Sequence, residues 1–111
     1  MIPSDKEAQL PAKILVVDDT PQNLILLQSL LAVTGYEVIT ASDGEQALIK
    51  AEQESPDLIL LDSMLPTLAG YEVCSQLKGN KKTRPILIIM ISPDGGTEQM
   101  VRSFEAGARD F

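Results

Sequence analysis

Histidine is absent from this 111-residue sequence, and cysteine occurs once, as Cys74. Without histidine, the chain cannot form a Ser-His-Asp or Cys-His catalytic pair, a histidine-ligated zinc site or a phosphohistidine. A single cysteine excludes an internal disulfide and fits a reducing, cytoplasmic compartment. Because no base is available to activate it, we expect Cys74 to be a buried, unreactive thiol. Proton or phosphoryl chemistry in this chain therefore depends on carboxylates, hydroxyls or lysine.

Positive charge and long apolar runs are also scarce. Nine Lys and Arg residues stand against 16 Asp and Glu residues, and the net charge of -7 argues against nucleic acid or an anionic membrane as a direct partner. The longest uninterrupted apolar run covers residues 86–91, which is too short to cross a membrane. Residues 1–13 are polar, contain Pro3 and Pro11, and resemble neither a signal peptide nor a membrane anchor.

The composition that remains is typical of one soluble, globular domain. Hydrophobic residues make up 44% of the chain and charged residues 23%, a balance that allows a core without disulfides or structural metal. We expect residues 1–12 to form a flexible lead-in and residues 13–111 to form a single folded domain.

Short apolar runs alternate with segments of helical periodicity along the chain. Helical spacing predicts a helix after each run, the last of them capped by Thr97 and ending at Gly107. Strict alternation favours an α/β fold with a doubly wound parallel sheet. We expect the usual flavodoxin-like strand order, 2-1-3-4, which a fifth strand would extend. The runs that predict strands are residues 13–17, 36–41, 57–61 and 86–91.

Cap residues delimit the first two predicted helices. Thr20 offers an N-cap oxygen, Pro21 suits the first helical position, and Gly35 ends the first helix. Ser42 and Glu45 fit a capping box for the second helix. The residues expected to face the core from the first helix are Leu24, Leu27, Leu30 and Leu31.

Polar side chains follow three of the predicted strands. Asp18 and Asp19 come directly after the first strand, Asp62 after the third and Ser92 after the fourth. Parallel strands present their carboxyl ends at one edge of the sheet, where ligands bind, so we expect these side chains to meet. Carboxylates about 4 Å apart repel by about 4 kcal/mol at an effective dielectric of 20. An all-oxygen cluster therefore predicts a hard cation, and a shallow site suits Mg²⁺ better than calcium.

Each of these residues also has an ordinary structural interpretation. An aspartate at a strand end commonly caps the next helix, and a serine before proline is typical of a turn. Thr20 already offers a cap, which weakens that interpretation for Asp18 and Asp19. Joint placement after neighbouring strands favours a metal and phosphoryl site, in which a metal-bound carboxylate can act as a nucleophile toward phosphorus.

These residues, in this order, resemble the receiver domains of two-component response regulators. The resemblance covers residues 13–111 and rests on several spaced motifs. Residues 20–24 are most similar to receivers attached to diguanylate cyclases or hybrid kinases. The motifs are Ile14 to Asp19, Pro56 to Asp62 with Pro66, Gly70 to Val73, and Phe104 to Ala108.

The resemblance implies that Asp62 accepts a phosphoryl group from a histidine kinase or phosphotransfer domain. It also implies that Asp19 ligates Mg²⁺ directly, Asp18 mostly through water, and Met64 through its backbone carbonyl. A domain of this kind regulates an output domain or a partner. It is not an enzyme beyond its own phosphorylation and dephosphorylation.

By the same resemblance, Ser92 and Phe111 occupy the switch positions. The family's lysine is expected beyond Phe111, so this chain has no catalytic lysine, and the fifth strand and last helix are expected to be missing.

Two further departures are Ala69, where an aspartate often precedes the glycine, and Pro93, which would stiffen the switch loop. Without a fifth strand, the edge at residues 86–91 predicts self-association.

Two other functions fit parts of the pattern. A non-phosphorylated interaction module with the receiver fold would also lack the lysine, although retention of Asp18, Asp19 and Asp62 argues against it. An aspartate-nucleophile phosphatase would place a second acid two residues after the nucleophile, where this sequence has Met64.

Overall fold

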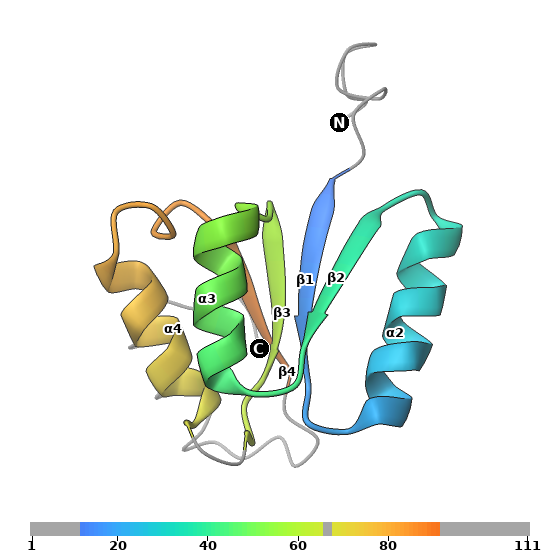
Figure 1. Cartoon of the computed structure of the whole chain (residues 1–111), viewed down its shortest axis with the longest axis horizontal. Coiled ribbons are helices and arrows are strands. Elements are labelled where there is room, and N and C mark those ends of the chain that lie inside the picture. Colours follow the sequence, from blue (N-terminus) through green and yellow to red (C-terminus); the bar gives the residue numbers. More distant parts are fainter. Residues whose placement is uncertain (1–11, 66–67, 92–111) are drawn as a thin grey trace, which may run out of the picture.

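Strands and helices alternate in the computed structural model, which describes residues 12–65 and 68–91 (Figure 1). Within these residues the predicted types and order of elements are confirmed, with strand bounds that differ by at most one residue. The predicted division into a lead-in and a domain stays a prediction, because residues 1–11 and 92–111, including the helix after Thr97, lie outside the description. The strands are β1 (Lys13–Val17), β2 (Glu37–Ala41), β3 (Leu58–Asp62) and β4 (Leu87–Ile91). The helices are α2 (Pro21–Val33), α3 (Gly44–Glu54) and α4 (Gly70–Gly79).

The strands form one parallel sheet in the order β2-β1-β3-β4, which confirms the predicted order. β1 lies between β2 and β3, so that Ile14 pairs with Val38 on one side and Leu58 on the other. β3 also pairs with β4, and Asp62 lies opposite Ile91. Within the described residues β4 pairs only with β3, and self-association through its outer edge stays a prediction.

The best-buried layer lies between the sheet and the helices α3 and α4, which Figure 1 shows side by side. Alternate residues of a strand point to opposite faces of a sheet. Leu15, Ile59 and Ile88, each 0% exposed, belong to this layer. Ala47 of α3 and Leu77 of α4 join it from the helices. Burying one large aliphatic side chain stabilises the folded state by about 1.5–3 kcal/mol. Because the strands contribute several such side chains, this layer holds the sheet, and with it the ends of the strands, in place.

Helix α2 packs on β1 and β2. Ile14 of β1 is buried but does not belong to the layer under α3 and α4. Its side chain therefore points to the other face of the sheet, and α2 is the helix that covers this face. Leu24, Leu27 and Leu31 are half-buried. Leu30 is 58% exposed, so the prediction that it faces the core is wrong. A helix turns by about 100° per residue, which moves this side chain off the face that the other three share. In the part of the chain that is described, no helix has the length and hydropathy of a membrane span.

Two predicted helix caps differ in the structure. Thr20 is the N-cap residue of α2, but its side chain makes no capping hydrogen bond. Its backbone N–H instead donates to Asp18 Oδ1 at 2.8 Å. The N-cap of α3 is Asp43, whose Oδ1 accepts from the Gln46 N–H at 2.8 Å. The capping box predicted to begin at Ser42 is thus wrong by one residue, because Asp43 is as favourable an N-cap residue as serine and takes that position.

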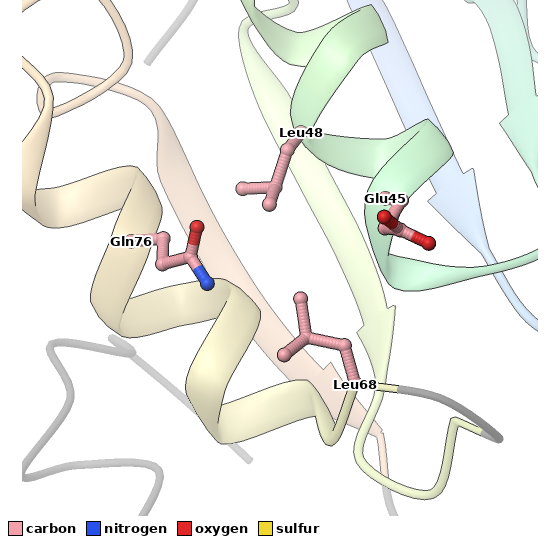
Figure 2. Close-up of a pocket in the computed structure, with 4 residues that line it drawn as sticks. All are labelled: Glu45, Leu48, Leu68 and Gln76. Atoms are coloured by element: carbon pink, nitrogen blue, oxygen red, sulfur yellow. The ribbon is translucent and has the colours of Figure 1, made fainter.

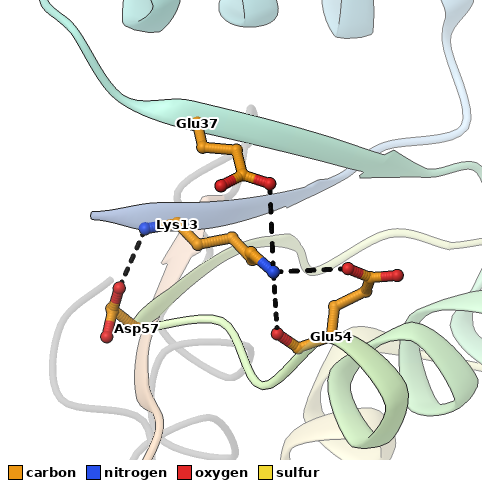
Figure 3. Close-up of polar contacts among 4 residues, drawn as sticks. All are labelled: Lys13, Glu37, Glu54 and Asp57. Carbon is orange, nitrogen blue, oxygen red and sulfur yellow. Dashed lines mark hydrogen bonds and ion pairs between the residues drawn. The ribbon is translucent and has the colours of Figure 1, made fainter. Parts of the chain in front are cut away.

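Lys13, at the start of β1, links three acidic residues at the amino end of the sheet (Figure 3). Its backbone N–H donates to Asp57 Oδ2 at 2.8 Å. Its ammonium group donates to the Glu54 carbonyl at 3.2 Å and to the Glu54 carboxylate at 3.3 Å, and lies 3.9 Å from Glu37. The three acids are exposed, and exposed ion pairs contribute at most about 1 kcal/mol each. This cluster supports the fold at the edge opposite the predicted site.

Candidate functional site

Three carboxylates meet at the carboxyl edge of the sheet. Asp18 and Asp19 follow β1, and Asp62 is the last residue of the adjacent strand β3. One oxygen from each residue lies within 4.8 Å of the others. Neighbouring parallel strands end at the same edge, which explains why residues far apart in the sequence converge. The structure therefore brings together the three acids that the sequence predicted to meet.

Asp18 is held by its backbone and by both carboxylate oxygens. Its N–H donates to the carbonyl of Ala41 at the end of β2, at 3.1 Å. Its Oδ1 accepts from the Thr20 N–H at 2.8 Å, and its Oδ2 accepts from Asn23 Nδ2 at 3.3 Å. The neighbouring Asp19 is exposed, while Asp18 is half-buried. The two adjacent acids therefore differ, since one is oriented by the protein and the other faces solvent.

Asp62 is the buried member of the cluster, at 7% exposed. Burial raises the pKa of its carboxyl above the ordinary value, and the charges of Asp18 and Asp19 raise it further. The N–H of Met64 donates to Asp62 Oδ1 at 2.9 Å and opposes these effects on the pKa. Ionised Asp62 is thus costly in this fold unless positive charge is brought to it.

The donor set fits a hard divalent cation. Carboxylate oxygens are the ligands that Mg²⁺ prefers, and three of them this close repel one another in the absence of a cation. The ion pairs between described residues join Lys13 and Lys82 to glutamates elsewhere in the fold. Met64 lies two residues after Asp62 and is bonded to it through its N–H. Ligation by the Met64 carbonyl stays a prediction.

A cavity of about 220 Å³ opens beside the carboxylates. Its polar wall is made by Asp18, Asn23 and Asp62, and its apolar wall by Leu26, Leu27 and Ile91. A larger groove of about 390 Å³ lies between α3 and α4, lined by Glu45, Leu48, Leu68 and Gln76 (Figure 2). None of the three clustered acids lines that larger groove. The smaller cavity is thus the one that two of the clustered acids, Asp18 and Asp62, line.

Gly70 places the start of α4 directly against the end of β3. Its N–H donates to the Ser63 carbonyl at 3.1 Å. A Cβ at this position would lie 2.5 Å from the Asp62 carbonyl oxygen and 2.7 Å from Ser63 Cα. Because no real Cβ tolerates such contacts, only glycine lets the helix approach this closely. The backbone that carries Asp62 is thereby held in place.

Asn23 and Gly70 are site-forming residues to which the sequence reasoning assigned no role. A glycine that opens a helix four residues after a proline is a weak signal, and an asparagine in the first turn of a helix is ordinary. Two predicted switch residues, Ser92 and Phe111, lie outside the described residues, so their roles remain predictions.

The fold and the site together define a class of protein. It is a flavodoxin-like α/β domain that carries a buried aspartate and two further carboxylates at the carboxyl edge of its parallel sheet. Carboxylates are the ligands that hard divalent cations prefer, and this edge of a parallel sheet is where ligands of such folds bind.

Comparison with known proteins identifies the family. The sequence model of one protein family, the response regulator receiver domain, matches residues 14–111. The chain belongs to this family. It is a receiver domain of two-component signalling, a regulatory module and not a conventional enzyme. The resemblance inferred from the sequence motifs is thereby confirmed.

Relatives of known function are longer than this chain. It is 54% identical over 99 residues to the alkaline phosphatase synthesis transcriptional regulatory protein PhoP of Bacillus subtilis, a match that covers 89% of this chain and 40% of PhoP. It is 43% identical over 102 residues to the response regulator PleD of Caulobacter vibrioides, with 92% of this chain and 22% of PleD covered. The chain thus spans less than half of either relative.

A similar solved structure contains the predicted metal. The receiver domain of the sensor histidine kinase PA1611 from Pseudomonas aeruginosa has a magnesium ion coordinated in its active-site cleft. Its fold matches with a TM-score of 0.83 at 31% sequence identity, over 91% of this chain and 83% of that chain.

Proposed function

We propose that this receiver domain is a phosphorylation-dependent switch whose phosphoacceptor is Asp62. The observation that carries the proposal is the buried Asp62 carboxylate within 4.8 Å of the carboxylates of Asp18 and Asp19. A carboxylate oxygen attacks the phosphorus of a phosphohistidine, so that a P–O bond forms while the P–N bond breaks and the imidazole leaves with the electron pair. The chain contains no histidine, so the phosphoryl donor is another chain or domain.

Mg²⁺ is the proposed cofactor of this transfer. Asp19 and Asp62 would hold it directly, Asp18 mostly through water and Met64 through its backbone carbonyl. The bound ion neutralises negative charge on the incoming phosphoryl group. Support comes from the acidic cluster itself and from the magnesium in the PA1611 receiver.

The proposed partners are a histidine kinase or phosphotransfer domain and an output domain or separate target. PhoP, which is a transcriptional regulatory protein, supports an output of this kind. The acidic receiver itself would touch neither nucleic acid nor membrane, and would work in the cytoplasm, consistent with its net charge of -7. Phosphorylation would shift Ser92 and Phe111 between two arrangements.

Acetyl phosphate, a small phosphoryl donor, tests the proposal with this chain alone. Incubation with Mg²⁺ is expected to add the mass of one phosphoryl group in intact-mass spectrometry. The gain is expected to disappear in Asp62→Asn, because the amide is a poor nucleophile. Asp43→Asn serves as the matched control, since asparagine also caps a helix well and Asp43 lies outside the cluster.

Two results would refute Asp62 as the acceptor. One is an unchanged mass gain in Asp62→Asn, and the other is loss of the gain in Asp43→Asn to the same extent. A folded chain that binds Mg²⁺ but never gains a phosphoryl group would favour the non-phosphorylated interaction module instead.

A further inference from the structure

Asn23 borders the acidic cluster from the first turn of α2. Its Nδ2 donates to Asp18 Oδ2 at 3.3 Å, and the residue lines the same cavity as Asp18 and Asp62. We propose that Asn23 is a positioning residue, which holds the Asp18 carboxylate in the orientation that the cation site requires. The inference rests on the proposed function, because it concerns the same site.

The two oxygens of Asp18 are held by donors from different sources. The Thr20 N–H holds Oδ1 at 2.8 Å, and the Asn23 amide holds Oδ2 at 3.3 Å. With the Thr20 donor alone, rotation of the carboxylate about the Cβ–Cγ bond is opposed by one hydrogen bond. The second donor, on the other oxygen, restricts that rotation further before any ligand arrives. A pre-oriented ligand costs less conformational entropy on binding, and the cation is therefore held more tightly.

A neutral amide is suited to this position because it donates without adding charge. A lysine or arginine bonded to Asp18 would compete with a cation for the carboxylate, since it neutralises the same charge. Asn23 leaves all three acids of the cluster available to attract a divalent ion. The amide therefore orients one ligand of the site and preserves the electrostatic attraction of the whole.

Mg²⁺ affinity of the full chain, measured by isothermal titration calorimetry at fixed ionic strength, tests the inference. Asn23→Leu keeps the branched shape and the number of heavy atoms but cannot donate, and we expect it to weaken binding about three- to tenfold. Asn23→Gln retains the amide and is expected to recover most of the loss. Gln22→Ala, at the exposed neighbouring position, is expected to bind as the unchanged chain does.

Stability of the metal-free variants separates positioning from a merely structural role. Asn23 is exposed, so urea unfolding in EDTA is expected to be the same for all variants. Wild-type affinity in Asn23→Leu, or equally weak binding in Asn23→Gln, would overturn the inference and leave the proposed function intact. Absence of Mg²⁺ binding by the unchanged chain would instead refute the proposed metal site, and the role of Asn23 with it.

Discussion

At the scale of single residues, Asp62 is held in a state that costs stability. Burial, followed by the charges of Asp18 and Asp19, raises its pKa in the folded state above the ordinary 3.8. An acidic group whose pKa is higher in the folded state than in the unfolded state makes its full contribution to stability only below its pKa in the unfolded state. That contribution is lost as the pH rises through its pKa in the folded state. At neutral pH, ionised Asp62 therefore destabilises the metal-free protein.

Asp62→Asn is accordingly expected to be more stable than the unchanged chain at pH 7 in EDTA. The advantage is expected to shrink below pH 3.8, where the carboxyl is neutral in both the folded and unfolded states. Urea unfolding followed by circular dichroism at the two pH values measures both effects. Lower stability of Asp62→Asn at pH 7 would show that the carboxylate is stabilised by contacts other than those described above.

Two buried hydroxyls provide a second, matched test at this scale. Within the described residues, Ser63 Oγ is buried without a hydrogen-bond partner, whereas Thr83 Oγ1 donates to the Leu77 carbonyl at 2.6 Å. An unpaired buried hydroxyl has lost its hydrogen bonds to water without forming any within the protein. Ser63→Ala is expected to stabilise the fold by about 1 kcal/mol, and Thr83→Val to destabilise it by about 1–2 kcal/mol. Equal losses in the two variants, measured by urea unfolding, would contradict this assignment of partners.

At the scale of elements, the junction between β3 and α4 is the tightest contact near the site. Gly70→Ala would place a Cβ 2.5 Å from the Asp62 carbonyl oxygen, and we expect a loss of about 1–3 kcal/mol from the forced shift of α4. Gly79→Ala, at the other end of the same helix, meets nothing within 4 Å. It is expected to stabilise the helix by up to about 1 kcal/mol. Thermal unfolding of both variants checks the contrast, which would fail if Gly70→Ala were as stable as Gly79→Ala.

The elements also show where sequence reasoning succeeds and where it stops. β1 and β3 were predictable because an apolar run of four or five residues that ends in an aspartate is too short for a helix and is typical of a buried strand. The exposure of Leu30 was not, because it depends on which neighbour the helix packs against, and the cap at Asp43 was not, because Ser42 and Asp43 are equally favourable N-cap residues. Local propensity is similar for the competing choices, and tertiary contacts decide between them.

At the scale of the whole molecule, cation binding and folding are coupled. A ligand that binds only the folded state stabilises it by RT ln(1 + [L]/Kd), which is about 2.7 kcal/mol at a hundredfold excess over Kd. Mg²⁺ is therefore expected to raise the thermal midpoint of the unchanged chain, with a much smaller rise in Asp62→Asn. Sodium chloride at matched ionic strength is the control, because the net charge of -7 makes any salt stabilising to some degree. An equal rise with sodium alone would remove the case for a specific site.

The sequence by itself determined the alternation of elements and the residues that stand at the strand ends. Run length, periodicity and residue type carry that information, and each is local to a short segment. Only the tertiary structure decided that three carboxylates lie within 4.8 Å, that Asp62 is buried among them, and that Asn23 orients Asp18. The distance between the acids and the desolvation of Asp62 arise between segments far apart in the chain, and the short-range bond from Asn23 forms only once both side chains are placed, so no local pattern records them.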